Sequence, residues 1–188
     1  MLTTMNDLLV DNLRDLYSAE TQLLKALPKL ARATSSPLLA EAFEAHLDET
    51  REHVERLRDI FDMLDERPGG KKCYGMAGLI EEGSEAIEHE GSDTLRDAAI
   101  IAAAQRVEHY EIAAYGCVVE YAKLLELKEI AELLGETLDE EKAADEKLSE
   151  IAETEVNPQA LLEGSDENEE EEYEDRESDE PEYEEAEL

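Results

Sequence analysis

Carboxylates interrupt apolar helical patterns at two places in the chain. Glu20 falls on a line of leucines that recur at three- and four-residue steps near the N-terminus. Glu108 and Glu111 interrupt a second line, within mainly small apolar residues, and their spacing places both on one face of a helix. An ionised carboxylate in such surroundings costs several kcal/mol unless a cation neutralises it. The nearest cationic residue in the sequence, Arg106, falls on a different face, so we expect a bound cation.

Two other segments resemble each other and supply further donors. Residues 46–57 (HLDETREHVERL) and 137–148 (TLDEEKAADEKL) align without a gap, which indicates an internal repeat. The first segment places Glu49 and His53 one helical turn apart, and His46 adds a second imidazole.

The second copy of the repeat leaves one assignment open. Glu141 and Asp145 lie one helical turn apart, whereas the strict repeat partner of Glu49 is Glu140. We prefer Glu141 because it lies nearer the centre of the apolar stripe, and Glu140 stays an alternative. Acidic residues are so frequent here, 52 of 188, that a single Glu can also be a solvated surface residue.

These donors predict a metal site rich in oxygen ligands. Oxygen-rich sites with one or two imidazoles suit iron or manganese better than zinc, which prefers fewer ligands with more nitrogen or sulfur. The predicted metal ligands are Glu20, Glu49, His53, Glu108, Glu111 and Glu141, with His46, Glu140 and Asp145 as further candidates.

The periodic apolar segments predict an all-α fold. Helices are expected over residues 6–34, 37–66, 74–90, 94–125 and 128–154, with a kink at Pro28, and no strand pattern occurs. Short links make the first pair and the last pair of long helices antiparallel. The longer connection contains the short helix, which is the layout of a ferritin-like antiparallel four-helix bundle with a crossover.

The C-terminal segment differs from the rest. From about Gly164 the chain is almost entirely acidic, without apolar periodicity, so it cannot bury enough surface to offset its ordering entropy. We predict a bundle over residues 1–156 and a disordered acidic tail over 157–188.

Charge and composition exclude several classes of partner. The formal net charge is −35, which disfavours nucleic acid and anionic membranes as partners. No signal peptide or membrane span is recognisable, so we expect a cytoplasmic protein. Cys73 and Cys117 stand in no metal-ligand spacing and are expected to be reduced.

Five stretches of the sequence closely resemble the YciF-type (YciE/YciF) ferritin-like family. They are LRDLYSAETQLLKALPKLA, FEAHLDETREHVERL, GGKKCYGMAGLIEEG, AQRVEHYEIAAYG and ETLDEEKAADEKL, and together they cover about residues 6–153. The resemblance implies a rubrerythrin-like bundle, a di-metal centre holding two iron ions or alternatively manganese, a role in stress response, ferroxidase activity and a homodimer.

The ligand pattern of rubrerythrin-like sites, which the resemblance implies, maps onto most of the candidates. It implies Glu20 from the first helix, Glu49 with His53 or His46 from the second, and Glu108 with Glu111 from the third. The fourth helix normally supplies a Glu followed by a His, but Ala144 and Asp145 occupy those places here. This departure bears on the identity of the metal and on its oxygen chemistry.

Three functions compete at this point. The leading one is oxidation of Fe(II) by oxygen or peroxide, with Tyr17, Tyr110 and Tyr115 as nearby hydrogen-bonding or radical-quenching groups. The second is a non-enzymatic stress-response bundle with a structural metal site or none. The third is a manganese site that consumes peroxide.

The acidity of the whole body, not only of the tail, predicts a halophilic protein that is stabilised by salt. At molar salt the Debye length is about 3 Å, so repulsion between surface carboxylates is screened. We therefore expect the helical circular dichroism signal to melt at a higher temperature in molar KCl than in dilute buffer. Identical melting under the two conditions would contradict this expectation.

Overall fold

A computed structural model describes residues 2–163, and within them the chain is helical without strands. The five α-helices are α1 (Met5–Ala33), α2 (Pro37–Met63), α3 (Tyr74–Ile87), α4 (Asp93–Leu124) and α5 (Lys128–Ile151). The predicted all-α class is therefore confirmed for this part of the chain. Helix α1 continues through Pro28 as far as Ala33.

Side chains at the helix starts explain where the long helices begin. Thr4 and Asp7 form a capping box at α1, in which each side chain accepts a hydrogen bond from the other residue's backbone N–H. Ser36 caps α2, with Pro37 following it in the first turn, and Ser92 caps α4. These caps satisfy N–H groups that have no partner within the helix.

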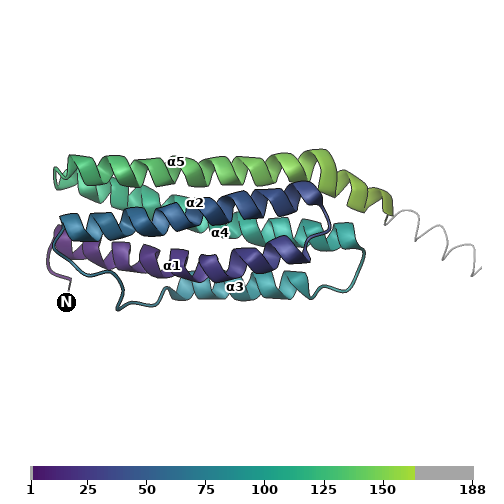
Figure 1. Cartoon of the computed structure of the whole chain (residues 1–188), viewed down its shortest axis with the longest axis horizontal. Coiled ribbons are helices and arrows are strands. Elements are labelled where there is room, and N and C mark those ends of the chain that lie inside the picture. Colours follow the sequence, from purple (N-terminus) through teal and green to yellow (C-terminus); the bar gives the residue numbers. More distant parts are fainter. Residues whose placement is uncertain (1, 164–188) are drawn as a thin grey trace, which may run out of the picture.

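The four long helices lie side by side along the long axis of the molecule (Figure 1). Helix α1 packs on α2 and α4, and α5 packs on α4 and α2, so each long helix contacts two others. The short helix α3 packs on α1 and α4. Helix α4 contacts α1, α3 and α5, which fits its sequence, apolar on nearly every face.

The buried apolar residues form two clusters with a polar layer between them. One cluster includes Leu23, Phe43 and Leu148, and the other includes Leu16 and Leu57. A fully buried side chain of this kind contributes about 1.5–3 kcal/mol relative to an exposed one. The two clusters thus hold the four helices together on both sides of the polar layer.

Helix α3 is fixed to the bundle by a small polar network. The Tyr110 hydroxyl donates to Asp15 Oδ2 at 2.6 Å and lies 2.9 Å from Cys73 Sγ. Gly75 permits this contact, because a Cβ atom there would lie 2.9 Å from the Tyr110 ring. Both cysteines, buried Cys73 and exposed Cys117, are free, as expected.

The C-terminal helix extends beyond its predicted end. Helix α5 passes into a π-helical turn, Ala152–Val156, and residues 157–163 are again helical, although they were predicted to belong to the disordered tail. The wide turn ends two residues before Pro158, which lacks a backbone N–H, and the helix continues past this proline. Val156 is buried, and Glu155 accepts a 2.5 Å hydrogen bond from Ser36, so packing holds this extension.

The predicted disorder of residues 164–188 lies outside the described residues. No helix within residues 2–163 is long and apolar enough to cross a membrane.

Candidate metal centre

Two groups of buried side chains in the polar layer could each hold a metal ion. His46, Glu108, Glu111 and Glu141 form the first group, and Glu20, His53 and Glu141 form the second. Within each group, one ligand atom from every residue lies within 4.8 Å of the others. Glu141 belongs to both groups, so its carboxylate lies where it could bridge two cations.

All four long helices contribute to this centre. Helix α1 supplies Glu20 and α5 supplies Glu141, while α4 supplies Glu108 and Glu111 from adjacent turns. Helix α2 supplies His46 and His53, which lie two turns apart on one face. The same periodicity that buries the apolar stripes therefore directs these side chains inward.

Most of the inward-facing polar atoms have no hydrogen-bond partner within the protein. The buried atoms without a partner at the centre are Glu20 Oε2, His46 Nε2, His53 Nδ1, Glu108 Oε2, and both carboxylate oxygens of Glu111 and of Glu141. Buried polar groups in folded proteins are normally paired, and an unpaired buried charge is strongly unfavourable. Divalent cations would satisfy all these atoms at once, so the donor set fits metal ions.

Each histidine is oriented by a carboxylate on its outer side. His46 Nδ1 lies 3.3 Å from Glu49 Oε2, and His53 Nε2 lies 3.1 Å from Glu140 Oε2. When the outer nitrogen donates its proton, the inner nitrogen keeps a lone pair that points at the carboxylates. Histidine ligands of metal sites are typically held in this way.

The inner histidine nitrogens lie close to the carboxylates they face. His46 Nε2 is 3.5 Å from Glu108 Oε1. His53 Nδ1 is 3.1 Å from Glu141 Oε1 and 3.4 Å from Glu20 Oε1. A cation between such atoms would replace these contacts with bonds to the metal.

The internal repeat explains the different positions of Glu140 and Glu141. Glu49 and Glu140 are equivalent in the repeat, and both lie on the outer side of a histidine. Glu141 is equivalent to Thr50, and both are fully buried. Glu141 thus faces the interior, while Glu140 accepts a 2.6 Å hydrogen bond from Arg56.

Two other residues from the sequence prediction lie outside both groups. The Glu49 side chain is 47% exposed and contacts the centre only through His46. Asp145 lies 3.5 Å from His109 and from the Gln105 amide, away from the cluster. The sequence could not separate these acids from the buried ones, because acidic residues fill most polar helix positions.

The predicted tyrosines lie in three different surroundings. Tyr115 is buried beside the centre, and its hydroxyl donates a 2.5 Å hydrogen bond to Glu20 Oε1. Tyr110 bonds to Asp15 instead, and the Tyr17 hydroxyl lies 3.3 Å from Arg58. Only Tyr115 therefore contacts a residue of the two groups directly.

Without a cation, the surroundings favour the protonated forms of Glu108, Glu111 and both histidines, but not of Glu141. Burial raises the pKa of Glu108 and Glu111 well above the ordinary value. Burial lowers the pKa of both histidines, but the surrounding carboxylates outweigh it and raise the pKa of His46 to about 9 and of His53 to about 10. Burial also opposes ionisation of Glu141, yet the two histidines hold the pKa of Glu141 below its ordinary value.

Comparison with known proteins shows which family the chain belongs to. The family described as "Domain of unknown function (DUF892)" matches residues 4–161, nearly all of the described part. The chain belongs to the DUF892 family. Protein YciF of Escherichia coli (strain K12) is 48% identical over 160 residues, which is 85% of this chain and 96% of that protein.

Solved structures agree with this membership of the DUF892 family. The crystal structure of the E. coli stress protein YciF matches with a TM-score of 0.80 and 48% identity, over 83% of this chain and 99% of that one. YcfI of Rhodopseudomonas palustris, provisionally described as a structural protein, matches with a TM-score of 0.75 and 44% identity, over 78% and 94% of the chains. A Xanthomonas campestris protein matches at 21% identity with a TM-score of 0.68, over 87% and 99% of the chains, and shows the shared fold alone.

The raised pKa values predict how stability depends on pH. Groups whose pKa is raised by folding stabilise the protein while protonated, and this contribution is lost as the pH rises through the folded-state pKa. Glu108 and Glu111 start from 4.5, and the two histidines start from 6.5 and reach about 9 and about 10. The melting temperature of metal-free protein should therefore decrease as the pH rises from about 6.5 to about 10.

Added Mn(II) should reverse this trend, because cations bind the deprotonated ligands and displace their protons. Melting curves in Mn(II) and in chelator at each pH provide the measurement. A gap between the two curves that does not widen with pH would contradict the prediction. The double variant Glu108→Gln plus Glu111→Gln is the control and should show little effect of Mn(II).

The outer carboxylates should affect metal affinity without binding the metal. Replacing Glu49 by Gln removes the charged acceptor of the His46 proton, so we expect affinity to fall about ten- to a hundredfold. Competition with a chromophoric chelator gives the affinity. Glu52→Gln, on the exposed side of the same helix, is the matched control and should leave it unchanged. Equal affinities for the Glu49 and Glu52 variants would exclude the orienting role.

Proposed function

We propose that this protein is a ferritin-like di-metal carboxylate protein that binds two Fe(II) ions and oxidises them with oxygen or peroxide. The observation that supports the proposal best is the set of buried donor atoms without hydrogen-bond partners that meet from all four long helices. The arrangement of those helices fits an antiparallel ferritin-like bundle, in which metal sites are built from inward-facing carboxylates and histidines.

Charge balance supports two divalent ions rather than one. Glu20, Glu108, Glu111 and Glu141 are each at most 2% exposed, and fully ionised they carry four negative charges. Two divalent cations neutralise four carboxylates, with His46 and His53 as neutral ligands. A single ion would leave two buried negative charges that protons on the carboxylates or histidines would have to balance.

The protein's own residues hold this arrangement in place. Glu141 is positioned to bridge the two groups, and Glu49 and Glu140 orient the histidines. Tyr115 donates to Glu20 and so fixes one oxygen of that carboxylate. Fe(II) bound in such a site would supply one electron per ion to an oxidant, and the apolar clusters on both sides limit access of water.

A role in stress response is part of the proposal. It is supported by the 48% identity to YciF of E. coli, which is described as a stress protein. The homodimer implied by the family resemblance stays a prediction.

A structural metal site is the second candidate function. The similarity to YcfI, provisionally described as a structural protein, favours it, as does Ala144 at the place where rubrerythrin-like sites have a histidine. In this case the cations would join the four helices and raise stability without turnover. Manganese would suit this donor set as well as iron.

Aerobic addition of Fe(II) to metal-free protein tests the proposal. We expect binding of two Fe(II) per chain and a ferric absorbance that rises much faster than autoxidation in buffer. Glu111→Gln removes a ligand of the first group and should slow the initial rate at least tenfold, which corresponds to about 1.4 kcal/mol. Glu132→Gln, exposed on α5, is the matched control and should behave as the unmodified protein.

Two outcomes distinguish the candidates. A ferric signal no faster than autoxidation, together with a melting temperature raised by Fe(II) under anaerobic conditions, would support the structural site. Absence of both effects would exclude a metal function of this centre.

A further inference from the structure

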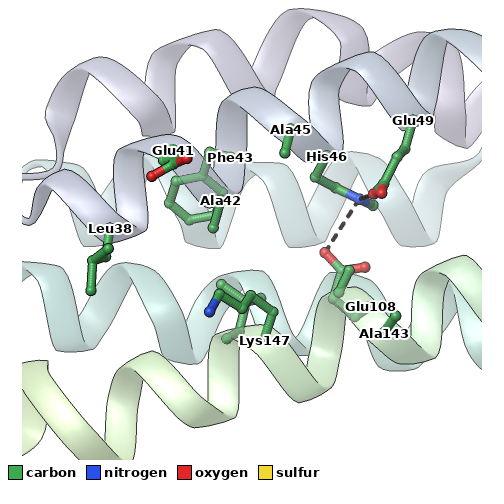
Figure 2. Close-up of a pocket in the computed structure, with 12 residues that line it drawn as sticks. Leu38, Glu41, Ala42, Phe43, Ala45, His46, Glu49, Glu108, Ala143 and Lys147 are labelled. Carbon is green, nitrogen blue, oxygen red and sulfur yellow. Dashed lines mark hydrogen bonds and ion pairs between the residues drawn. The ribbon is translucent and has the colours of Figure 1, made fainter.

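A cavity of about 340 Å³ opens between α2 and α5 and ends at the metal centre. Figure 2 shows His46, Glu49 and Glu108 at one end of it, with Leu38, Glu41 and Phe43 towards the other. Cavities of about 300–1,000 Å³ are typical of sites for small organic ligands. The volume is larger than either dioxygen or hydrogen peroxide requires.

Small residues on the two facing helices create this cavity. Ala42 and Ala45 of α2 face Ala143 and Ala144 of α5 across it. Ala144 is the repeat partner of His53, so the second half of the bundle has a methyl group where the first half has an imidazole. The space at Ala144 is therefore open beside the first group of ligands.

Unpaired donor atoms of the centre lie at the inner end of the cavity. His46 is 6% exposed and Glu108 is 2% exposed, and both line it. His46 Nε2 and Glu108 Oε2 have no hydrogen-bond partner within the protein. A molecule in the cavity would thus reach the ion held by His46 and Glu108.

The shape and charge of the cavity restrict which kind of molecule it can bind. Phe43, Leu38 and Leu148 supply apolar walls, which favour an organic body. Glu41, Glu49 and Lys147 are charged residues of the same lining. The four buried carboxylates already balance two divalent cations, so an anionic head group would add an uncompensated buried charge. The head group should therefore be neutral and should carry an oxygen donor.

We propose that the oxidant of this centre is an organic hydroperoxide, ROOH, whose apolar group occupies this cavity. The inference rests on the proposed function and names the oxidant for it. Two Fe(II) ions supply one electron each, and the O–O bond breaks. With two protons from the solvent at the open mouth of the cavity, ROOH gives ROH and water, and the iron becomes two Fe(III).

Binding is tested first, without redox chemistry. The protein is loaded with Zn(II), and cumyl alcohol, the product of cumene hydroperoxide, is the probe in saturation-transfer NMR. We expect transfer to its aromatic protons in the unmodified protein, a loss in Ala144→Leu and in Ala42→Leu, and no change in Ala113→Leu, an exposed alanine of α4. Melting curves show that each variant is folded.

Reaction is tested by anaerobic stopped-flow mixing of the Fe(II)-loaded protein with cumene hydroperoxide or hydrogen peroxide. We expect faster oxidation by cumene hydroperoxide. The ratio of the two rates should fall at least tenfold in Ala144→Leu and in Ala42→Leu, and should stay unchanged in Ala113→Leu.

The outcomes separate this inference from the proposed function. Fe(II) oxidation with equal rates for both peroxides, and a ratio unaffected by the variants, would overturn the organic hydroperoxide and leave the ferroxidase proposal intact. Failure of every oxidant to react would overturn both. Absence of saturation transfer from the folded Zn(II)-loaded protein would overturn the binding site in either case.

Discussion

The fold of this protein depends on how it compensates four carboxylates that are buried together. Glu20, Glu108, Glu111 and Glu141 lie between two apolar clusters and are largely shielded from water. The two histidines are the only cationic groups that contact them among the described residues, and Arg56 reaches only the outer Glu140. Protons or metal ions must supply the remaining positive charge, and this choice links the stability of the bundle to its chemistry.

The position of the polar layer limits how much it destabilises the bundle. Each long helix carries its polar residues at mid-length, with apolar turns on both sides, so the helices stay packed even where the core is not apolar. The ligands therefore stand on rigid elements, and their separation is set by packing between helices rather than by loops. A centre built in this way is largely preformed before a cation binds.

The sequence predicted those parts of the centre in which an acidic residue stands among apolar neighbours. The pattern of leucines and alanines around Glu20, Glu108 and Glu111 showed that these acids would be buried, and the five helices followed from periodicity. Where several neighbouring candidates were all acidic, the sequence pattern could not tell which of them faces the interior. It could not place Glu49 outside the ligand groups or show that His46 faces inward, because both depend on how α2 is rotated against α4 and α5. The helical extension over 157–163 was also missed, since a π-helical turn before Pro158 has no recognisable sequence signal.

Comparison of the two repeat halves shows why the centre is asymmetric. Helix α2 presents His46, Thr50 and His53 to the interior, and the equivalent positions of α5 are Thr137, Glu141 and Ala144. The two halves thus share an outer carboxylate but differ at these three positions. Ala144 leaves space on the α5 side that continues into the cavity lined by Ala42 and Ala45 of α2. A bundle made of two equal halves would have an imidazole at this position too, and Ala144 in its place leaves the space through which, in our proposal, an outside molecule would reach the ions.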